Sequence, residues 1–405
     1  MNLLPTLRLS FEMTDVLAHI EQNGIKINTD TLMQIKEEYE QEMFVLERRL
    51  NELARNAMGD TPINLDSPDD RSMLLYSCRV KDKKQWAVLF NLGHEVRGAT
   101  KKPKLRKRMT RTEFKHHVIR HTDVVYKTEG SQCPACRGTG RYKAVRKDGT
   151  LGKAVRICKL CEGKGVRYKN LNEVAGFKVL PRDVFDTASG GFKTDKTTLE
   201  DLSLTLRGEA QEFAQSYIRY SALRTYLRSF VEGMFNNVDD KGFIHTEYMQ
   251  CITATGRLSS RNPNFQNMPR GSTFAIRKAI ESRFEGGSIL EGDYAQLEFR
   301  VAGYLANDDN IKLDVEAGTD VHSYTASIIG CTRQEAKAHT FKPLYGGVSG
   351  TDSQQRYYRA FKEKYKGVTE WHKQLQRDAV TRKEVTLPSG RVYAFPDSKW
   401  TDWGT

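Results

Sequence analysis

Four of the seven cysteines occur as two CxxC pairs, CPAC (Cys133, Cys136) and CKLC (Cys158, Cys161), separated by 21 residues. Each pair is followed by glycines, in CRGTG and CEGKG, which allow the chain to turn beneath a metal ion. Four thiolates complete a tetrahedral structural zinc site that has no open position for catalysis. The alternative is two disulfides in a secreted protein, but acidic residues interrupt any apolar core in the N-terminal MNLLPTLRLSFEMTD, so no signal peptide is predicted. The pattern therefore predicts one structural Zn²⁺ in a small insertion, residues 131–168.

Length and charge bound the class of protein. The 405 residues suffice for two or three subdomains, and 38% hydrophobic with 28% charged residues is ordinary for a soluble chain. No apolar run of about 18 residues occurs, so no membrane span is predicted. The 64 basic residues outnumber the 51 acidic ones, giving a net charge of +13. This balance favours a polyanionic partner, with nucleic acid first.

The positive charge is concentrated in one stretch, residues 97–127, which holds 11 Lys or Arg against two acids. Its centre, KKPKLRKRMTRTEFKHH, is either a solvated loop or a surface that follows a phosphate backbone. The second interpretation predicts DNA contacts from four cations of this run: Lys104, Arg106, Lys107 and Arg108.

The hydrophobic pattern predicts a helix-rich chain with a few strands. Apolar residues recur at helical spacing over 29–57 and again over 199–235. β-Branched and aromatic residues with glycines predict hairpins at 242–260 and 385–396. The segment 288–306 begins as a buried strand and becomes helical. Helices dominate after that segment.

A ladder of side chains four residues apart, Arg333, Lys337, Phe341 and Tyr345, lies in RQEAKAHTFKPLYGG. On a helix, residues at i and i+4 share one face. Two cations followed by two aromatic rings suit a ligand with a polyphosphate at one end and a flat base at the other. The alternative is an amphipathic helix whose aromatic side chains face the core. Pro343 predicts that the helix kinks or ends near residues 339–342.

Asp293 follows the apolar residues Ile289 and Leu290 and begins DYAQLEFRV. A carboxylate at the end of a buried strand is a natural ligand for Mg²⁺, which takes one or two protein carboxylates together with substrate phosphates. Such an aspartate is alternatively a cap for the following helix. Glu298 lies five residues further on and is alternatively half of a structural pair.

Four segments in order carry a resemblance to a known family: TATGRLSSRNPNFQNMP (253–269), DYAQLEFRV (293–301), DVHSYTAS (320–327) and RQEAKAHTFKPLYGG (333–347). They resemble the core motifs of family A (DNA polymerase I-like) DNA polymerases, most closely the bacteriophage members. IEQNGIKINTDTL and INLDSP are similar to the segment that opens the polymerase domain. Outside this resemblance, each half of the cysteine insertion is similar to the CxxCxGxG repeat of the DnaJ-type zinc domain.

The resemblance implies a right-hand architecture of thumb, partial palm and fingers, and a role for each matched residue. Asp293 and Lys337 would be catalytic, with Asp293 binding two catalytic Mg²⁺ ions and Glu298 excluding a ribose 2′-hydroxyl. The implied residues of the nucleotide site are Tyr294, Gln296, Glu298, His322, Arg333, Lys337, Phe341 and Tyr345. The implied contacts to the primer–template duplex are Arg257, Asn264, Gln266 and Asn267.

Simpler interpretations of some of these residues stay open. His322 is alternatively a polar core residue, and Arg257 a solvated loop cation. Asn264 and Asn267 are alternatively turn formers in RNPNFQN.

One departure from the family pattern concerns the second metal-binding carboxylate, which the family places in a His-Asp-Glu turn. No HDE occurs in this sequence, and Asp397 and Asp402 lack that context. We therefore expect an N-terminal part of a polymerase that requires a complementing C-terminal fragment.

The predicted fold class is α/β of the α+β kind, helix-rich, with a zinc-binding insertion. The expected divisions are the start of the polymerase domain and thumb base (1–75), a thumb region (76–200), a thumb helix with the first part of the palm (201–305) and fingers (306–405).

The expected function is DNA-directed DNA polymerase, with primer–template DNA and dNTPs as partners, in the cytoplasm of a bacterial host. The alternative is a non-catalytic remnant that binds primer–template DNA. A single-subunit RNA polymerase is disfavoured by Glu298.

Overall fold

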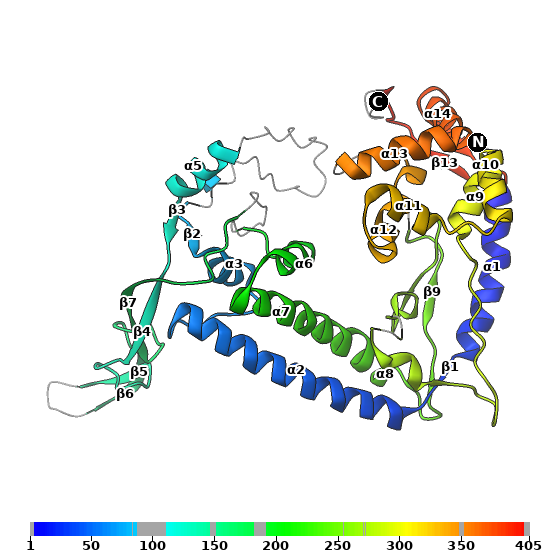
Figure 1. Ribbon diagram of the computed structural model, residues 1–405. Helices are drawn as coiled ribbons and strands as arrows, with labels where there is room; N and C mark the ends of the chain where they lie inside the picture. The colour runs from blue at the N-terminus through cyan, green and yellow to red at the C-terminus, as the bar shows by residue number, and fades with distance from the viewer. Residues whose placement is uncertain are drawn as a thin grey trace. The chain divides into compact units, whose positions relative to one another are not determined.

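The computed structural model divides the chain into two compact units, and each is described by itself (Figure 1). Unit 1 comprises Met1–Lys26, His245–Arg261 and Glu281–Thr405, and unit 2 comprises Ile27–Ile244 and Asn262–Ile280. The residues that the structure describes are 4–82, 84–86, 111–145, 151–181, 192–253, 255–269, 271, 273–347 and 352–400. Among the described helices, none combines the length and the apolar composition that a membrane span requires.

Unit 2 is built on a long helix, α2 (Thr29–Met58), as the apolar spacing predicts. Its N-cap is Asn28, whose side chain accepts a hydrogen bond from the backbone of Thr31. The other helical elements of unit 2 whose bounds the structure describes are α3 (Pro68–Tyr76), α5 (Arg111–His121), α6 (Lys196–Thr205), α7 (Gly208–Tyr226), the π-helical η1 (Leu227–Val231), α8 (Glu232–Phe235), η2 (Phe265–Asn267) and η3 (Ala275–Ala279). The helix predicted over 199–235 is therefore confirmed, with a break at residues 206 and 207.

The core of unit 2 joins α2 and α7 through fully buried side chains that include Leu50, Leu53 and Phe213. Ion pairs flank this core on the surface. Arg49 Nε lies 2.7 Å from Glu212 Oε1, and the Glu212 pKa is lowered by its hydrogen bonds with Arg49.

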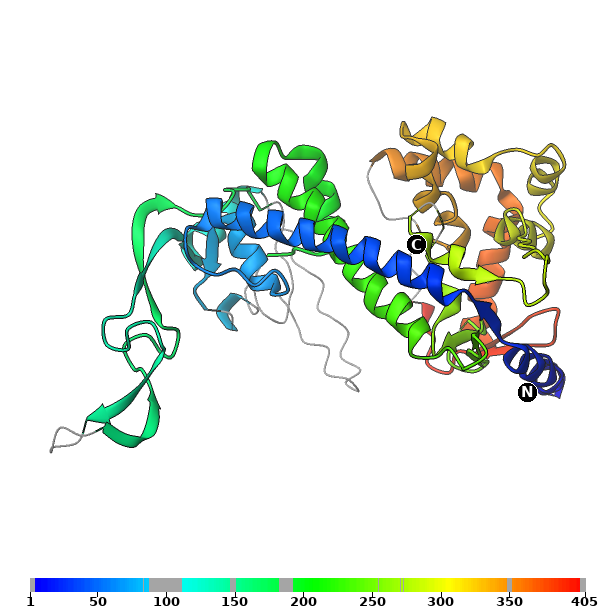
Figure 2. The ribbon, with the colours of Figure 1, turned by 90° about the horizontal axis from the view of Figure 1, so that it is seen from below.

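An arm of antiparallel strands, residues 126–174, extends unit 2, and we call it the cysteine arm (Figures 1 and 2). Its inner pair is β4 (Tyr126–Gln132) with β7 (Val166–Val174), and its outer pair is β5 (Arg141–Val145) with β6 (Leu151–Ile157). The four cysteines of the two CxxC pairs stand where one strand pair gives way to the next. A further pair, β2 (Cys78–Val80) with β3 (Thr122–Val124), precedes the arm.

The root of the cysteine arm is held by the turn that ends α2. Gly59 adopts φ 74 and forms a bridge with Thr128, and the backbone N–H of Asp60 donates to the Thr128 carbonyl at 2.8 Å. The Asp60 carboxylate accepts a hydrogen bond from the backbone of Gly130 at 2.8 Å. A β-bulge lies between Tyr126 and Thr128, where this contact is made.

Unit 1 is mostly helical. Its helical elements are α1 (Leu4–Asn23), α9 (Leu297–Leu305), α10 (Asp309–Glu316), α11 (Val321–Ile329), α12 (Arg333–Thr340), the 3₁₀ turn η4 (Pro343–Tyr345), α13 (Asp352–Lys364) and α14 (Lys366–Thr381). Its core is rich in aromatic rings, with Phe299, Tyr357 and Tyr365 all buried.

Two predicted hairpins are present in unit 1. Strand β9 (Glu247–Met249) pairs with β10 (Ser259–Arg261), and β12 (Glu384–Thr386) pairs with β13 (Val392–Ala394). The short strands β1 (Ile25–Ile27), β8 (Phe243–Ile244) and β11 (Ile280–Glu281) do not belong to unit 1 alone, and their order in one sheet is β11-β1-β8.

The prediction of a buried strand before Asp293 is wrong. Residues 288–294 form neither strand nor helix, and Ile289 and Leu290 are 58% and 95% exposed. An apolar run becomes a strand only when a neighbouring strand satisfies its backbone, and no described strand pairs with this segment.

Candidate active site

The two cations of the ladder lie on α12, and an acid from the neighbouring helix holds the first of them. Arg333 Nε is 2.5 Å from Asp320 Oδ2. Asp320 is the N-cap of α11 and accepts the backbone N–H of His322 at 3.1 Å. Arg333 therefore holds the pKa of the Asp320 carboxyl far below its usual range. Arg333 keeps a half-exposed guanidinium that is oriented by this pair.

His322 lies between the cations and the aromatic part of the ladder. Its Nδ1 is 3.0 Å from Thr340 Oγ1, and its ring meets Phe341 edge to face at 5.3 Å. Burial lowers the pKa of His322, and the charges of Arg333 and Lys337 lower it further against the opposing effect of Asp320. The site therefore combines two cations with a histidine that favours its neutral form.

The helix of the ladder stops where Pro343 predicts. α12 ends at Thr340, and a separate 3₁₀ turn carries Tyr345. Phe341 packs toward Phe299 of α9, with ring centroids 6.4 Å apart. Tyr345 is 67% exposed and lies after the break, so the four side chains do not form one continuous helical face.

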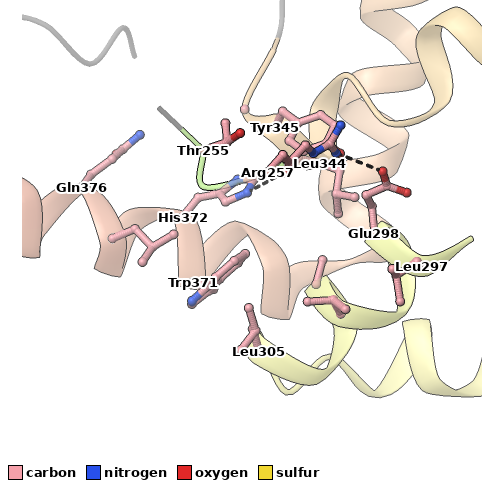
Figure 3. Close-up of a pocket in the computed structure, with 14 residues that line it drawn as sticks. Thr255, Arg257, Leu297, Glu298, Leu305, Leu344, Tyr345, Trp371, His372 and Gln376 are labelled. Atoms are coloured by element: carbon pink, nitrogen blue, oxygen red, sulfur yellow. Dashed lines mark hydrogen bonds and ion pairs between the residues drawn. The ribbon is translucent and has the colours of Figure 1, made fainter. Parts of the chain in front are cut away.

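Arg257 meets Glu298 across the site: its Nη2 lies 3.3 Å from Glu298 Oε1 (Figure 3). The loop that carries Arg257 is fixed by the second hairpin, because Tyr393 donates its hydroxyl hydrogen to the Thr255 carbonyl at 2.9 Å. Gly256 adopts φ +77 beside Arg391, where a Cβ would lie 1.9 Å from the guanidinium.

Arg257 and Glu298 border a pocket of about 830 Å³ within unit 1 (Figure 3). Tyr345 also lines it, whereas Arg333 and His322 do not. Its apolar wall includes residues that the sequence patterns did not single out: Leu305 of α9, Leu344 of η4 and Trp371 with Leu375 of α14. His372 Nε2 donates to the Leu344 carbonyl at 2.9 Å and ties α14 to η4. In the sequence, only the spacing of Trp371 and Leu375 could have indicated that this face of α14 lines the pocket. Any amphipathic helix has such spacing.

Asp293 lies in an exposed extended segment four residues before α9 begins. Gln296 follows in the left-handed region at φ 54 and is the N-cap residue of α9, while Tyr294 is 75% exposed. The structure thus places Asp293 before α9 and Glu298 in its first turn. Glu298 forms an ion pair, and Asp293 forms none with the residues that the structure describes.

Only one group of three or more potential metal ligands occurs among the described residues, and it consists of Cys133, Cys136, Cys158 and Cys161. Their sulfur atoms lie within 4.8 Å of one another, with Cys133–Cys158 at 3.8 Å and Cys136–Cys161 at 3.6 Å. A tetrahedral zinc site with bonds of about 2.3 Å has sulfur–sulfur edges of about 3.8 Å. The four thiols therefore fit one zinc ion.

The two halves of this cysteine cluster have the same backbone. Arg137 and Glu162 adopt φ 50 and 51, and the glycines that follow them, Gly138 and Gly163, adopt φ 83 and 85. Each half also directs a backbone N–H at a sulfur, because Gly140 donates to Cys136 at 3.3 Å and Gly165 to Cys161 at 3.2 Å.

These N–H groups favour the thiolate. Burial raises the pKa of Cys161, but the Gly165 N–H and the neighbouring thiols outweigh burial and lower this pKa to about 7. Burial raises the pKa of the Cys136 thiol, whose deprotonation a bound cation would assist.

The sequence profile of DNA polymerase family A matches residues 169–403. The chain belongs to DNA polymerase family A. This family A chain is 28% identical to DNA polymerase I of Lactococcus lactis over 243 residues, which is 55% of this chain and 27% of that enzyme. It is 30% identical to DNA polymerase I of Treponema pallidum over 222 residues, which is 50% of this chain and 22% of that enzyme. The matched region thus spans about a quarter of these relatives.

The fold of the family A chain is that of a polymerase domain. It is similar to the solved POL domain of Pol1 from M. smegmatis, in complex with DNA primer-template and dNTP, with a TM-score of 0.55. The likeness covers 94% of this chain and 51% of that chain at 21% sequence identity. The helix-rich α/β class is confirmed.

The remaining predicted DNA contacts of the family A chain lie elsewhere. Asn264, Gln266 and Asn267 belong to unit 2, at the short turn η2. The Asn264 side chain accepts the backbone N–H of Asn267 at 3.2 Å, which is the turn-forming role. Four predicted contacts lie outside the described residues: Lys104, Arg106, Lys107 and Arg108.

Proposed function

We propose that the chain is a DNA-directed DNA polymerase that adds deoxynucleoside monophosphates to a primer 3′-hydroxyl under the direction of a template. Membership of the family supports this proposal, and one arrangement carries it. Arg333, Lys337 and His322 gather at the junction of α11 and α12, and the Arg257–Glu298 pair lies in the same unit.

The cations are proposed to hold the triphosphate of the incoming dNTP. Arg333 is pre-oriented by Asp320, and Lys337 adds a second charge one helical turn away. Phe341 provides a ring beside His322 for the sugar and base, and Tyr345 is proposed to lie by the template base. Tyr294 and Gln296 are proposed to line the approach to the primer end.

Asp293 is proposed as the ligand of two Mg²⁺ ions, together with a further carboxylate that the motifs of this sequence do not identify. Its exposed carboxylate fits a hard cation, although one side chain supplies only part of a coordination sphere. When bound, the two ions would activate the primer hydroxyl and stabilise the leaving pyrophosphate. Lys337 would then neutralise charge that develops on the phosphates.

A complementing polypeptide segment is proposed to supply that carboxylate. Exposed apolar side chains in unit 1 support this idea, since soluble chains normally cover such clusters. On α1, Leu4 and Phe11 are 71% and 72% exposed, and Leu290 before Asp293 is 95% exposed.

Primer extension tests the proposal. The chain is assayed alone and together with the polypeptide encoded directly downstream, and extension is expected with the pair. Asp293→Ala is expected to abolish extension, whereas Asp309→Ala, at an exposed aspartate on α10, serves as the control. Extension that survives Asp293→Ala in the reconstituted enzyme would show that the catalytic role is misassigned.

The second candidate is a non-catalytic primer–template binding remnant, which the lack of an HDE motif in this sequence favours. It predicts binding of primer–template DNA with no extension, whether or not the downstream polypeptide is added.

Glu298 is proposed to exclude a ribose 2′-hydroxyl. Replacing it by Ala is expected to raise the ratio of ribonucleotide to deoxyribonucleotide incorporation. An unchanged ratio would contradict this role. It would also remove the argument against a single-subunit RNA polymerase.

The cysteine cluster is proposed to hold one structural Zn²⁺, and the bacteriophage origin and bacterial cytoplasm stay predictions of the sequence. Metal analysis of the purified chain is expected to give one zinc per chain. Cys133→Ser is expected to lose it, while Cys251→Ser, at an exposed cysteine outside the cluster, retains it. Well under one zinc in the unaltered chain would exclude the site.

A further inference from the structure

The cysteine arm differs from the helical body of unit 2 in how it treats its cations. In the body, arginines are paired with acids across helices: Arg49 with Glu212 and Arg219 with Glu42, at 2.7 Å and 2.6 Å. In the arm, seven described cations beyond the root are exposed, and no ion pair to them occurs in the part of the chain that the structure describes. They are Arg137, Arg141, Lys143, Arg156, Lys159, Lys164 and Arg167.

The amino-acid composition of the insertion shows the same excess of cations over acids. Residues 131–168 hold ten Lys or Arg against two Asp or Glu. Four thiolates around one Zn²⁺ carry a net charge of −2, so the cations still dominate when zinc is bound. Unpaired cations that repel one another weaken a small fold, and a polyanionic partner relieves that repulsion.

The shape of the arm suits a long, uniform anion. Strand β7 alone has nine residues and spans about 30 Å at the rise of a strand. Duplex DNA carries one negative charge per about 1.7 Å of axis, so an extended basic arm can meet several phosphates. The contact between the arm and Gly59 and Asp60 at its root fixes the direction in which the arm leaves α2.

The strand register places cations on both faces of the outer strand pair. Arg141 and Lys143 alternate with Tyr142 along β5, and Tyr142 is opposite Arg156 of β6. Tyr142 and Tyr168 are each 37% exposed, so the described part of this region presents two partly open rings beside seven exposed cations. This excess of cations over rings suits phosphates more than stacking on single-stranded bases.

We infer that the cysteine arm binds the phosphate backbone of duplex DNA without reading its sequence. This surface is additional to the nucleotide site of unit 1 and does not depend on polymerase activity. Binding requires neither a primer terminus nor a nucleotide, so it can be measured on blunt duplex DNA. The inference can therefore fail while the proposed function stands, and the reverse also holds.

The test compares two variants of the full chain with equal change in net charge. In the arm variant, four cations are neutralised: Arg141→Gln, Lys143→Gln, Arg156→Gln and Arg167→Gln. In the control, which we call the body variant, four lysines that form ion pairs outside the arm are neutralised, two in unit 2 and two in unit 1: Lys36→Gln, Lys196→Gln, Lys312→Gln and Lys373→Gln. Affinity for a blunt duplex is measured by fluorescence anisotropy from about 50 to 200 mM salt.

The arm variant is expected to bind at least about tenfold more weakly at 150 mM salt, and its log–log salt slope is expected to fall by roughly three to four. The body variant is expected to keep a slope within about one of the unaltered chain. Retention of one zinc by the arm variant shows that the arm is still folded, and Cys133→Ser provides the unfolded-arm reference.

Equal salt slopes for the arm and body variants would overturn the inference. So would an arm variant that binds the duplex as tightly as the unaltered chain, because the cations would then serve another partner, such as an acidic protein.

Discussion

Gly59 shows how one residue controls the base of the cysteine arm. It adopts φ +74, and a Cβ there would lie 2.3 Å from the carbonyl oxygen of Thr128. Any larger residue at position 59 would therefore destabilise the fold in two ways. Its backbone would be strained in the left-handed region, and its Cβ would clash with the backbone of β4.

We predict that Gly59→Ala lowers the free energy of unfolding of unit 2 by about 2–4 kcal/mol, since strain and the clash act together. Gly208→Ala is the matched control, because Gly208 has φ +61 but no atom within 4 Å of the added Cβ. Chemical denaturation measures both. Equal losses in the two variants would mean that the contact with Thr128 contributes nothing.

Three histidines of unit 1 titrate in the same direction. Burial is the largest cause that lowers the pKa of His322, His339 and His372 below the ordinary value of 6.5. The unfolded chain therefore takes up protons at a higher pH than the folded one, and stability falls as pH decreases through about 6.5.

We predict that the melting temperature of unit 1 decreases from pH 7.5 to pH 5.5, with Trp371, which lies beside His372 at 5.8 Å, as a fluorescence reporter. The variant His322→Asn is expected to flatten this dependence. A melting temperature that rises toward pH 5.5 would contradict the direction of the shifts.

At the scale of elements, Thr340 joins three helices. Its hydroxyl lies 3.0 Å from His322 Nδ1 and from Thr325 Oγ1 on α11, and its carbonyl accepts the hydroxyl hydrogen of Tyr357 on α13 at 2.8 Å. Thr340 is 1% exposed, so no water replaces a lost hydrogen bond easily.

We predict that Thr340→Val, which keeps the shape and removes the hydroxyl, lowers the stability of unit 1 by about 1–3 kcal/mol. Thr381→Val, at an exposed threonine of α14, is expected to change it by less than about 0.5 kcal/mol. Denaturation followed by Trp371 fluorescence measures both, and equal effects would rule out the buried network.

Elements whose stability is local were predictable from the sequence. The long helix α2 repeats apolar residues over eight turns, and the end of α12 follows from the missing N–H and the ring of Pro343. The strand before Asp293 was not predictable in the same way, because a strand depends on a partner that its own residues do not specify.

The candidate site shows the same limit. The motifs that carry Asp293, Arg333 and Lys337 are contiguous in sequence and could be recognised. Trp371, His372 and the contact of Tyr393 with Thr255 join segments more than a hundred residues apart or depend on a helix face, and no local pattern indicates them.

At the scale of the whole molecule, the two units have separate apolar cores and separate tryptophan reporters. Trp86 is fully buried in the core of unit 2, while Trp371 lines the pocket of unit 1. We predict that Leu53→Ala, at a fully buried position of unit 2, lowers the stability of unit 2 by about 2–5 kcal/mol.

The transition reported by Trp371 is expected to move much less in this variant. Hydrogen exchange resolved to peptides distinguishes the two units directly. An equal shift at peptides from both units would show that the molecule unfolds as one cooperative body.

The path of the chain between the units has a consequence for synthesis on the ribosome. Unit 2 has all of its residues once residue 280 has been made, whereas unit 1 draws on residues 1–26, 245–261 and 281–405. Helix α1 is therefore synthesised before unit 2 and gains its full set of neighbours only after unit 2 is complete. During that interval Leu17 of α1, which is 5% exposed in the folded chain, is available to chaperones that recognise nascent apolar segments.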